Sequence, residues 1–204
     1  VVPASSGPAF WREGPIAPDF KHEEVLPVLT RKALDWTERQ AGSGRPFFLY
    51  FALPAPHTPI VPRPEFQGRS GTNAYGDFCL QVDAVVGEVL DVLDRTGMAD
   101  NTLVIFTSDN GCSPSADFPA LARLGHRPSH HFRGHKADIF EGGHRIPLIV
   151  RWPARVPAGR RTEETVCLVD LLATCAEWCG AELPPGSAED GISNLALWEG
   201  RPYA

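Results

Sequence analysis

The pattern that most limits the fold is a long helix pattern followed by a short strand pattern that ends in polar residues. Apolar side chains recur at three- and four-residue steps from Tyr75 to Arg95, as on one face of an α-helix. Residues 102–107 are apolar and β-branched, and they run directly into the polar sequence 108–111. This order is typical of an α/β protein that carries a site where a strand ends.

Further helix and strand patterns alternate along the chain. Helices are predicted over 27–40 and 166–179, and strands over 46–52 and 146–151. The run over 46–52 is apolar and aromatic throughout, as in a strand buried on both faces. The alternation predicts a layered α/β fold with a largely parallel, mixed sheet and helices on both faces.

The chain also divides by composition. Residues 1–26 are rich in Pro and Gly and are expected to be extended, residues 27–180 to form the α/β core, and residues 181–204 to form a C-terminal tail. A length of 204 residues, 43% of them hydrophobic, suffices for one sizeable core. The chain begins with Val1 rather than Met and lacks a secretory signal pattern, so we expect a processed or partial chain.

Charge and hydropathy exclude some partners. No apolar run approaches the roughly 20 residues that a membrane helix needs, so no membrane partner is predicted. A net charge of -6 argues against a nucleic-acid surface, and an anionic substrate would need a local cluster of cations. The five cysteines contain no CxxC pair, which indicates neither a zinc site nor a full disulfide framework.

Asp109 and Asn110 are candidate metal ligands. A carboxylate and an amide carbonyl are hard oxygen donors of the kind that calcium or magnesium binds. The alternative is structural, because Asp-Asn-Gly is also a common turn sequence.

His57 and Lys136 are candidate catalytic and substrate-binding residues. His57 lies in a proline-rich loop that would restrict its side chain, as suits a general acid near neutral pH. Lys136 lies among cations and glycines that could hold an oxyanion. The alternatives are a histidine that only anchors its loop and a solvated basic loop. The adjacent His130 and His131 have no matching ligand spacing and stay unassigned.

The conjunction of several segments strongly resembles the sulfatase family, in order as well as in spacing. The matching segments are Phe47-Phe48-Leu49-Tyr50, Ala55-Pro56-His57-Thr58-Pro59, residues 100–111, Lys136, Glu141-Gly142-Gly143, Arg145-Ile146-Pro147, residues 149–153, Val169-Asp170-Leu171-Leu172 and Asp190-Gly191-Ile192-Ser193. The resemblance covers the chain from about Pro27 onward.

The resemblance implies an alkaline-phosphatase-like fold and a hydrolase that cleaves sulfate monoesters. It implies that Asp109 and Asn110 ligate calcium, with magnesium as the alternative, that His57 contacts the sulfate and assists the leaving group, and that Lys136 binds a sulfate oxygen. The substrate would be a sulfated small molecule or carbohydrate, and the compartment periplasmic, secreted or lysosomal.

One part of the family pattern is missing. Sulfatases make formylglycine from a Cys-x-Pro-x-Arg type motif that lies before the His57 loop, and no such motif stands there. Cys112-Ser113-Pro114 mimics it, but Ala116 stands at the position of the required Arg and the segment follows Asp109, so Cys112 is rejected as the nucleophile.

These departures predict a partial sulfatase domain, incomplete at its N-terminus. The chain by itself is expected to be inactive and to self-associate through an exposed sheet edge. The alternatives for the intact protein are a phosphoesterase or phosphonate hydrolase of the same superfamily and a non-catalytic sulfatase-like module.

Overall fold

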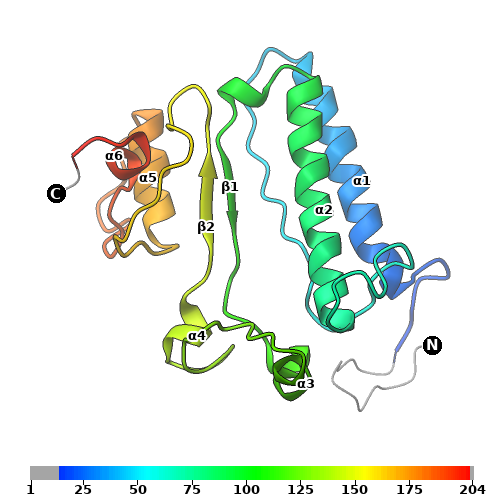
Figure 1. The fold of residues 1–204 in the computed structure, drawn as a ribbon. Coiled ribbons are helices and arrows are strands. Elements are labelled where there is room, and N and C mark those ends of the chain that lie inside the picture. Colours follow the sequence, from blue (N-terminus) through cyan, green and yellow to red (C-terminus); the bar gives the residue numbers. More distant parts are fainter. Residues whose placement is uncertain (1–13, 203–204) are drawn as a thin grey trace. The chain divides into compact units, whose positions relative to one another are not determined.

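The computed structural model describes residues 14–202 and places them in two compact units (Figure 1). The first unit comprises the described residues up to Met98 together with Thr107–Pro147, and the second comprises Ala99–Phe106 with the described residues from Leu148 onward. The elements are α1 (His22–Ala41), α2 (Ala74–Arg95), the 3-10 turn Ala99–Asn101, β1 (Val104–Thr107), the 3-10 turn Pro114–Ala116, α3 (Phe118–Arg123), α4 (Glu141–His144), β2 (Leu148–Arg151), α5 (Asp170–Cys179) and α6 (Leu195–Glu199).

The long helix of the first unit is held at both ends by local hydrogen bonds. The side chain of Asn73 accepts from the amide of Gly76 at the start of α2. At its end Gly97 adopts a φ of 73°, and the amide of Met98 donates to the carbonyl of Leu93 at 2.9 Å. This is the Schellman arrangement that a glycine just past a helix permits. The predicted helix over 75–95 is confirmed to within one residue.

Helix α1 starts earlier than the sequence pattern indicates. It begins at His22 rather than Pro27, so Pro27 lies inside the helix and removes one backbone hydrogen bond there. Glu23 and Glu24 lie in the first turn, where carboxylates interact favourably with the helix dipole. Of the expected extended segment 1–26, residues 1–13 lie outside the described residues.

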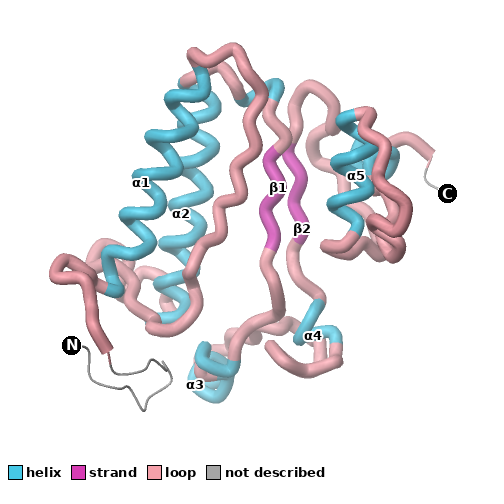
Figure 2. Tube along the Cα trace, turned by 180° about the vertical axis from the view of Figure 1, so that it is seen from behind, coloured by secondary structure: helices cyan, strands magenta, loops and turns pink. Residues whose placement is uncertain are grey.

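Helices α1 and α2 lie side by side and supply the core of the first unit (Figure 2). Leu26 of α1 packs with Phe78 and Val85 of α2, and each of these side chains is nearly inaccessible to solvent. The chain after α1 covers this cluster with partly buried apolar side chains, namely Phe51, Leu53, Ala55, Ile60 and Val61. The loop that holds His57 is therefore anchored on both sides by apolar burial.

The segment 46–52 is not the doubly buried strand that the sequence predicts. It is extended but has no strand partner among the described residues. Its side chains alternate: Phe47 packs edge-on against Trp36 at 5.5 Å, whereas Phe48 is 84% exposed and Tyr50 is 82% exposed. One face is covered by helix and the other is open, because a strand is buried on both faces only when layers lie on both sides of it.

The described sheet has two strands, β1 and β2, which run in opposite directions (Figure 1). Both strands begin two residues later than predicted, at Val104 and Leu148. The α/β class is confirmed, but a largely parallel, layered sheet is not confirmed by the described residues.

The second unit is organised by one buried carboxylate, Asp170. It accepts hydrogen bonds from the amides of Cys167 and Ile192 and from the side-chain amide of Asn194. Asn194 is fully buried, and its backbone amide donates to Thr174 at 2.9 Å. These bonds join the first turn of α5 to the segment that leads into α6.

The predicted helix over 166–179 is present as α5 but begins at Asp170, and α6 was not predicted. No helix in the described part of the chain combines the length and apolarity that crossing a membrane would require.

Replacing Asp170 by Asn should destabilise the second unit. The substitution replaces one carboxylate oxygen by an NH2 group, which would face the N–H donors that now bind Asp170. We expect this to lower the free energy of unfolding by about 2 to 4 kcal/mol. Urea denaturation of the purified chain measures this cost, with the exposed Glu163→Gln as the matched control. An Asp170→Asn variant as stable as the control would contradict the assigned role.

The same substitution should alter the pH dependence of stability. Burial raises the pKa of Asp170, but the amides of Ile192 and Cys167 and the side chain of Asn194 outweigh it and hold the pKa below its usual value. A depressed pKa stabilises the fold above the unfolded pKa of about 3.9, and this stabilisation is lost as pH falls through the folded value. The stability difference between wild type and Asp170→Asn should therefore shrink on acidification below about pH 4.

The exposed face of segment 46–52 should drive self-association of the isolated chain. An extended, aromatic segment without a strand partner offers free backbone donors and acceptors to a second chain. Replacing Phe48 and Tyr50 by Ser should shift the chain towards monomer in sizing chromatography with light scattering. A wild-type chain that is monomeric at micromolar concentration would contradict this prediction.

Candidate active site

His57 lies on an exposed loop between the two apolar stretches that cover the α1/α2 core. Its Nδ1 is 2.9 Å from the carbonyl oxygen of Thr58. Nδ1 also lies 3.3 Å from the hydroxyl oxygen of Thr58, which could donate to it. The carbonyl contact is the shorter of the two and needs a hydrogen on Nδ1, because a carbonyl only accepts. The other ring nitrogen, Nε2, is then the atom available to a substrate.

Asp109 and Asn110 lie in a bend directly after β1, with Asp109 exposed and Asn110 half-buried. The hydroxyl of Ser108 donates to the carbonyl of Asn110 at 2.9 Å and stabilises this bend. The bend is therefore compatible with the expected metal binding, because this hydrogen bond uses the backbone of Asn110 and not the side chain of Asp109 or Asn110.

Backbone hydrogen bonds join the loop after β1, residues 108–113 (the Asp109 loop), to residues 133–143 (the Lys136 loop). The amide of Gly111 donates to the carbonyl of Gly143 at 2.9 Å, and the amide of Lys136 donates to the carbonyl of Cys112 at 2.9 Å. The structure thus joins two of the sequence-predicted site segments within the first unit. His57 lies in the same unit, and its ring contacts Thr58 of its own loop.

Three glycines allow close backbone contacts here, Gly111 between the two loops and Gly142 and Gly143 within the segment that holds Lys136. A Cβ on Gly111 would overlap the carbonyl of Gly142, and a Cβ on Gly142 would overlap the carbonyl of Gly134. A Cβ on Gly143 would overlap the carbonyl of Asp138. The glycines of the Asp-Asn-Gly and Glu-Gly-Gly sequences are therefore required by backbone contact rather than by turn conformation alone.

The Lys136 loop is held by its neighbours. His135 donates its backbone amide to the carboxylate of Asp138 at 3.0 Å. The guanidinium of Arg133 lies 3.6 Å from the ring centre of Phe140, and Lys136 itself is half-buried. Ala137 adopts a φ of 77°, a left-handed conformation that costs an L-residue about 1–2 kcal/mol. This strain follows Lys136 directly, at a place where the surrounding contacts fix the backbone.

Several of these residues could not be assigned from sequence. Asn73 donates its side-chain amide to the carbonyl of Ala116 at 2.8 Å and so ties the start of α2 to the segment after Cys112. Arg145 pairs with Glu141 at 2.9 Å and lies over the ring of Phe132 at 4.6 Å. The i,i+4 spacing of Glu141 and Arg145 is the only signal in the sequence that could have indicated that pair.

Cys112 lies in a setting that keeps its thiol protonated. Burial raises the pKa of Cys112, and a hydrogen bond from Tyr75 only partly opposes this. Burial and the nearby Cys112 raise the pKa of Cys79 to about 11. All five cysteines are free thiols. A nucleophilic cysteine needs a lowered pKa, so this environment agrees with the rejection of Cys112.

The described residues offer two candidate metal ligands, Asp109 and Asn110. Among residues 14–202 there is no group of three or more His, Cys, Asp or Glu side chains that could hold a metal ion. Asp109 and Asn110 add two hard oxygens of the type that calcium prefers. The unassigned His130 and His131 rings contact each other, with centres 4.5 Å apart, and do not converge with these oxygens into such a group.

Comparison with known proteins identifies the family. Residues 15–181 match the sulfatase family, and the chain therefore belongs to it. The chain is 36% identical over 196 residues to an N-acetylgalactosamine-6-O-sulfatase of Bacteroides thetaiotaomicron, covering 95% of this chain and 38% of that protein. It is 38% identical over 169 residues to the steryl-sulfatase of Rattus norvegicus, covering 83% of this chain and 29% of that protein.

Solved structures of similar proteins support the same family assignment. A protein from a study of glycosaminoglycan metabolism in Bacteroides thetaiotaomicron superposes with a TM-score of 0.81 at 36% identity, over 91% of this chain and 38% of the other. A sulfatase from a Pseudoalteromonas species gives a TM-score of 0.75 at 29% identity, over 89% and 36% of the two chains. The chain thus spans well under half the length of the relatives that it matches.

Replacing Gly111 by Ala should destabilise the first unit by about 2 kcal/mol or more, because the new methyl group must displace the backbone of Gly142. Gly87 is the matched control: it lies inside α2 with open space around it, so Gly87→Ala should stabilise by about 0.5–1 kcal/mol. Urea denaturation compares the two variants. Equal effects of both substitutions would contradict the close backbone contact at Gly111.

Proposed function

We propose that the intact protein is a sulfatase that hydrolyses a sulfate monoester of a carbohydrate. Membership of the sulfatase family supports the reaction. The N-acetylgalactosamine-6-O-sulfatase matches over 95% of the chain and the steryl-sulfatase over 83%, and this wider match supports a sulfated sugar as the substrate. The activity would belong to the intact protein, in which this chain would form part of an alkaline-phosphatase-like layered sheet.

The observation that carries this proposal is the pair of backbone hydrogen bonds between the Asp109 and Lys136 loops. Through Gly111–Gly143 and Cys112–Lys136 they place a carboxylate, an amide oxygen and an ammonium group on adjoining loops. A metal ion held by the two oxygens and the ammonium of Lys136 would both place positive charge near the oxygens of a bound sulfate.

The donor set fits a calcium ion in part. Asp109 and Asn110 would be two of its ligands, since an exposed carboxylate and an amide carbonyl are hard oxygen donors. When present, the calcium ion would supply positive charge towards the sulfuryl oxygens, and a formylglycine from outside this chain would supply the nucleophile.

Lys136 and His57 would perform the remaining steps. The ammonium of Lys136 would bind a sulfuryl oxygen and stabilise the charge that builds there as the ester bond breaks. His57 would act in its protonated form: Nδ1–H stays bound to the Thr58 carbonyl, and Nε2–H gives its proton to the departing alcohol oxygen. The proton thus ends on the alcohol and the sulfur–oxygen bond is the one that breaks.

Two leaving groups separate the roles of these residues in the intact protein. Lys136→Ala should lower kcat about a hundredfold on both 4-nitrophenyl sulfate and a sugar 6-sulfate, because the charge on the sulfuryl oxygens is common to both. His57→Ala should lower kcat about a hundredfold on the sugar sulfate and much less on 4-nitrophenyl sulfate, whose phenolate needs little protonation.

The matched control is Lys32→Ala, which removes an exposed lysine of α1 and should leave both rates unchanged. Equal losses with His57→Ala on both esters would refute the general-acid role. Full activity of Lys136→Ala would refute the sulfate-binding role.

A further inference from the structure

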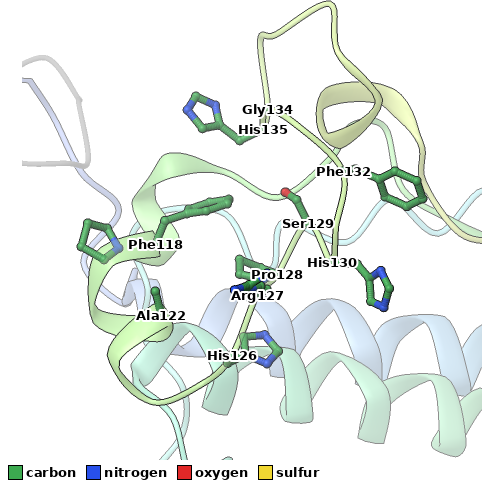
Figure 3. Close-up of a pocket in the computed structure, with 11 residues that line it drawn as sticks. Phe118, Ala122, His126, Arg127, Pro128, Ser129, His130, Phe132, Gly134 and His135 are labelled. Atoms are coloured by element: carbon green, nitrogen blue, oxygen red, sulfur yellow. The ribbon is translucent and has the colours of Figure 1, made fainter.

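A surface pocket of about 440 Å³ lies beside the Lys136 loop in the first unit. One wall is the short helix α3, with Phe118 and Ala122, and the other is the segment from His126 to His135 (Figure 3). His135, which lines the pocket, is the residue directly before Lys136. The pocket therefore adjoins the loop that we propose binds the sulfate.

The pocket is formed by a stretch of net positive charge in an acidic protein. Residues 118–137 contain three Arg, one Lys and four His but no Asp or Glu, whereas the whole chain has a net charge of -6. The nearest carboxylates in sequence are already engaged: Asp117 accepts from the amide of Ala120, and Asp138 accepts from the amide of His135.

Arg127 is the cation of this stretch best placed to meet a ligand. It lines the pocket and is exposed, and it forms no salt bridge within the described part of the chain. Arg133, by contrast, lies over the ring of Phe140, and Arg123 lies outside the pocket lining. An unpaired guanidinium beside a cavity offers a planar, bidentate site for a carboxylate or sulfate.

The remaining walls suit a sugar ring. Phe118 provides aromatic surface, and Pro119 and Pro128 add rigid apolar surface. The hydroxyl oxygen of Ser129 is buried and has no hydrogen-bond partner among the described residues. A buried hydroxyl without a partner at the edge of a cavity is expected to meet a ligand or a water molecule. Apolar walls with a few polar groups are typical of small-ligand sites.

We propose that this pocket binds an anionic group on the sugar that neighbours the sulfated sugar. The preferred substrate is then an oligosaccharide with at least two anionic groups, one of them the sulfate ester. Arg127 binds that group, Ser129 hydrogen-bonds the sugar, and the aromatic wall contacts its ring. The inference rests on the proposed sulfatase function and deepens it. A simple aryl sulfate would occupy only the Lys136 loop and leave the pocket empty.

The kinetic test compares three substrates of the intact protein. They are 4-nitrophenyl sulfate, N-acetylgalactosamine 6-sulfate, and a disaccharide in which that sugar is linked to a glucuronate. Arg127→Gln should lower kcat/KM about tenfold on the disaccharide, mainly through KM, and leave the other two unchanged. Arg123→Gln is the matched control, with the same loss of charge outside the pocket, and should leave all three unchanged.

A further arm identifies the anion. Replacing the glucuronate by a second sulfate on a neutral neighbouring sugar keeps the charge but changes the group. A tenfold loss with Arg127→Gln on both disaccharides indicates a general anion site, and a loss on only one identifies the group bound. Equal losses on all three original substrates, or no loss on either disaccharide, overturn the proposal.

Binding of the unsulfated glucuronate disaccharide, measured by titration calorimetry, separates this inference from the proposed function. It needs no turnover, and Arg127→Gln should weaken it about tenfold relative to Arg123→Gln. Wild-type protein that hydrolyses 4-nitrophenyl sulfate but binds this disaccharide no better than Arg127→Gln refutes the pocket alone. Binding that depends on Arg127, in a protein that hydrolyses no sulfate ester, refutes the proposed function alone.

Discussion

The contact between Gly111 and the Gly142–Gly143 backbone is the constraint on which the candidate site depends. Peptide groups meet there without side chains between them, so the loop after β1 and the loop after Lys136 share hydrogen bonds directly. A side chain at Gly111 would force the loop after β1 away from the backbone of Gly142. Side chains at Gly142 and Gly143 would instead clash with carbonyls of the segment that holds Lys136. The left-handed backbone of Ala137 lies beside this contact, and the neighbouring hydrogen bonds fix it in that strained conformation.

The sequence predicts the long helix α2 more completely than it predicts the pairing of strands, for a physical reason. A helix satisfies its own backbone, so the apolar period of α2 and the glycine after it are enough to place both ends. A strand makes its backbone hydrogen bonds to other strands, and the local sequence does not indicate which segments these are. Segment 46–52 has the composition of a buried strand, yet among the described residues it has a helical layer on one face and no strand beside it.

In the candidate site, the residue types could be predicted from the sequence but their arrangement in space could not. Asp109, Asn110, His57 and Lys136 could be proposed from residue type and from resemblance to the sulfatase family, which the family match confirms as the right family. Their arrangement could not, because it comes from carbonyl contacts at glycines and from Asn73, whose amide reaches Ala116 across 43 positions of sequence. Asp170 could not be recognised as a structural carboxylate, because two of its partners, Ile192 and Asn194, lie 22 and 24 positions away in the sequence.

The central claim is that the Asp109 and Lys136 loops serve sulfate transfer in the intact protein. The most direct test is a comparison of kcat/KM for 4-nitrophenyl sulfate and 4-nitrophenyl phosphate, which share one leaving group and differ in the transferred group. The account predicts that the sulfate is preferred by at least about tenfold, or 1.4 kcal/mol in the transition state. A faster reaction with the phosphate would contradict it and identify the protein as a phosphoesterase on a sulfatase scaffold.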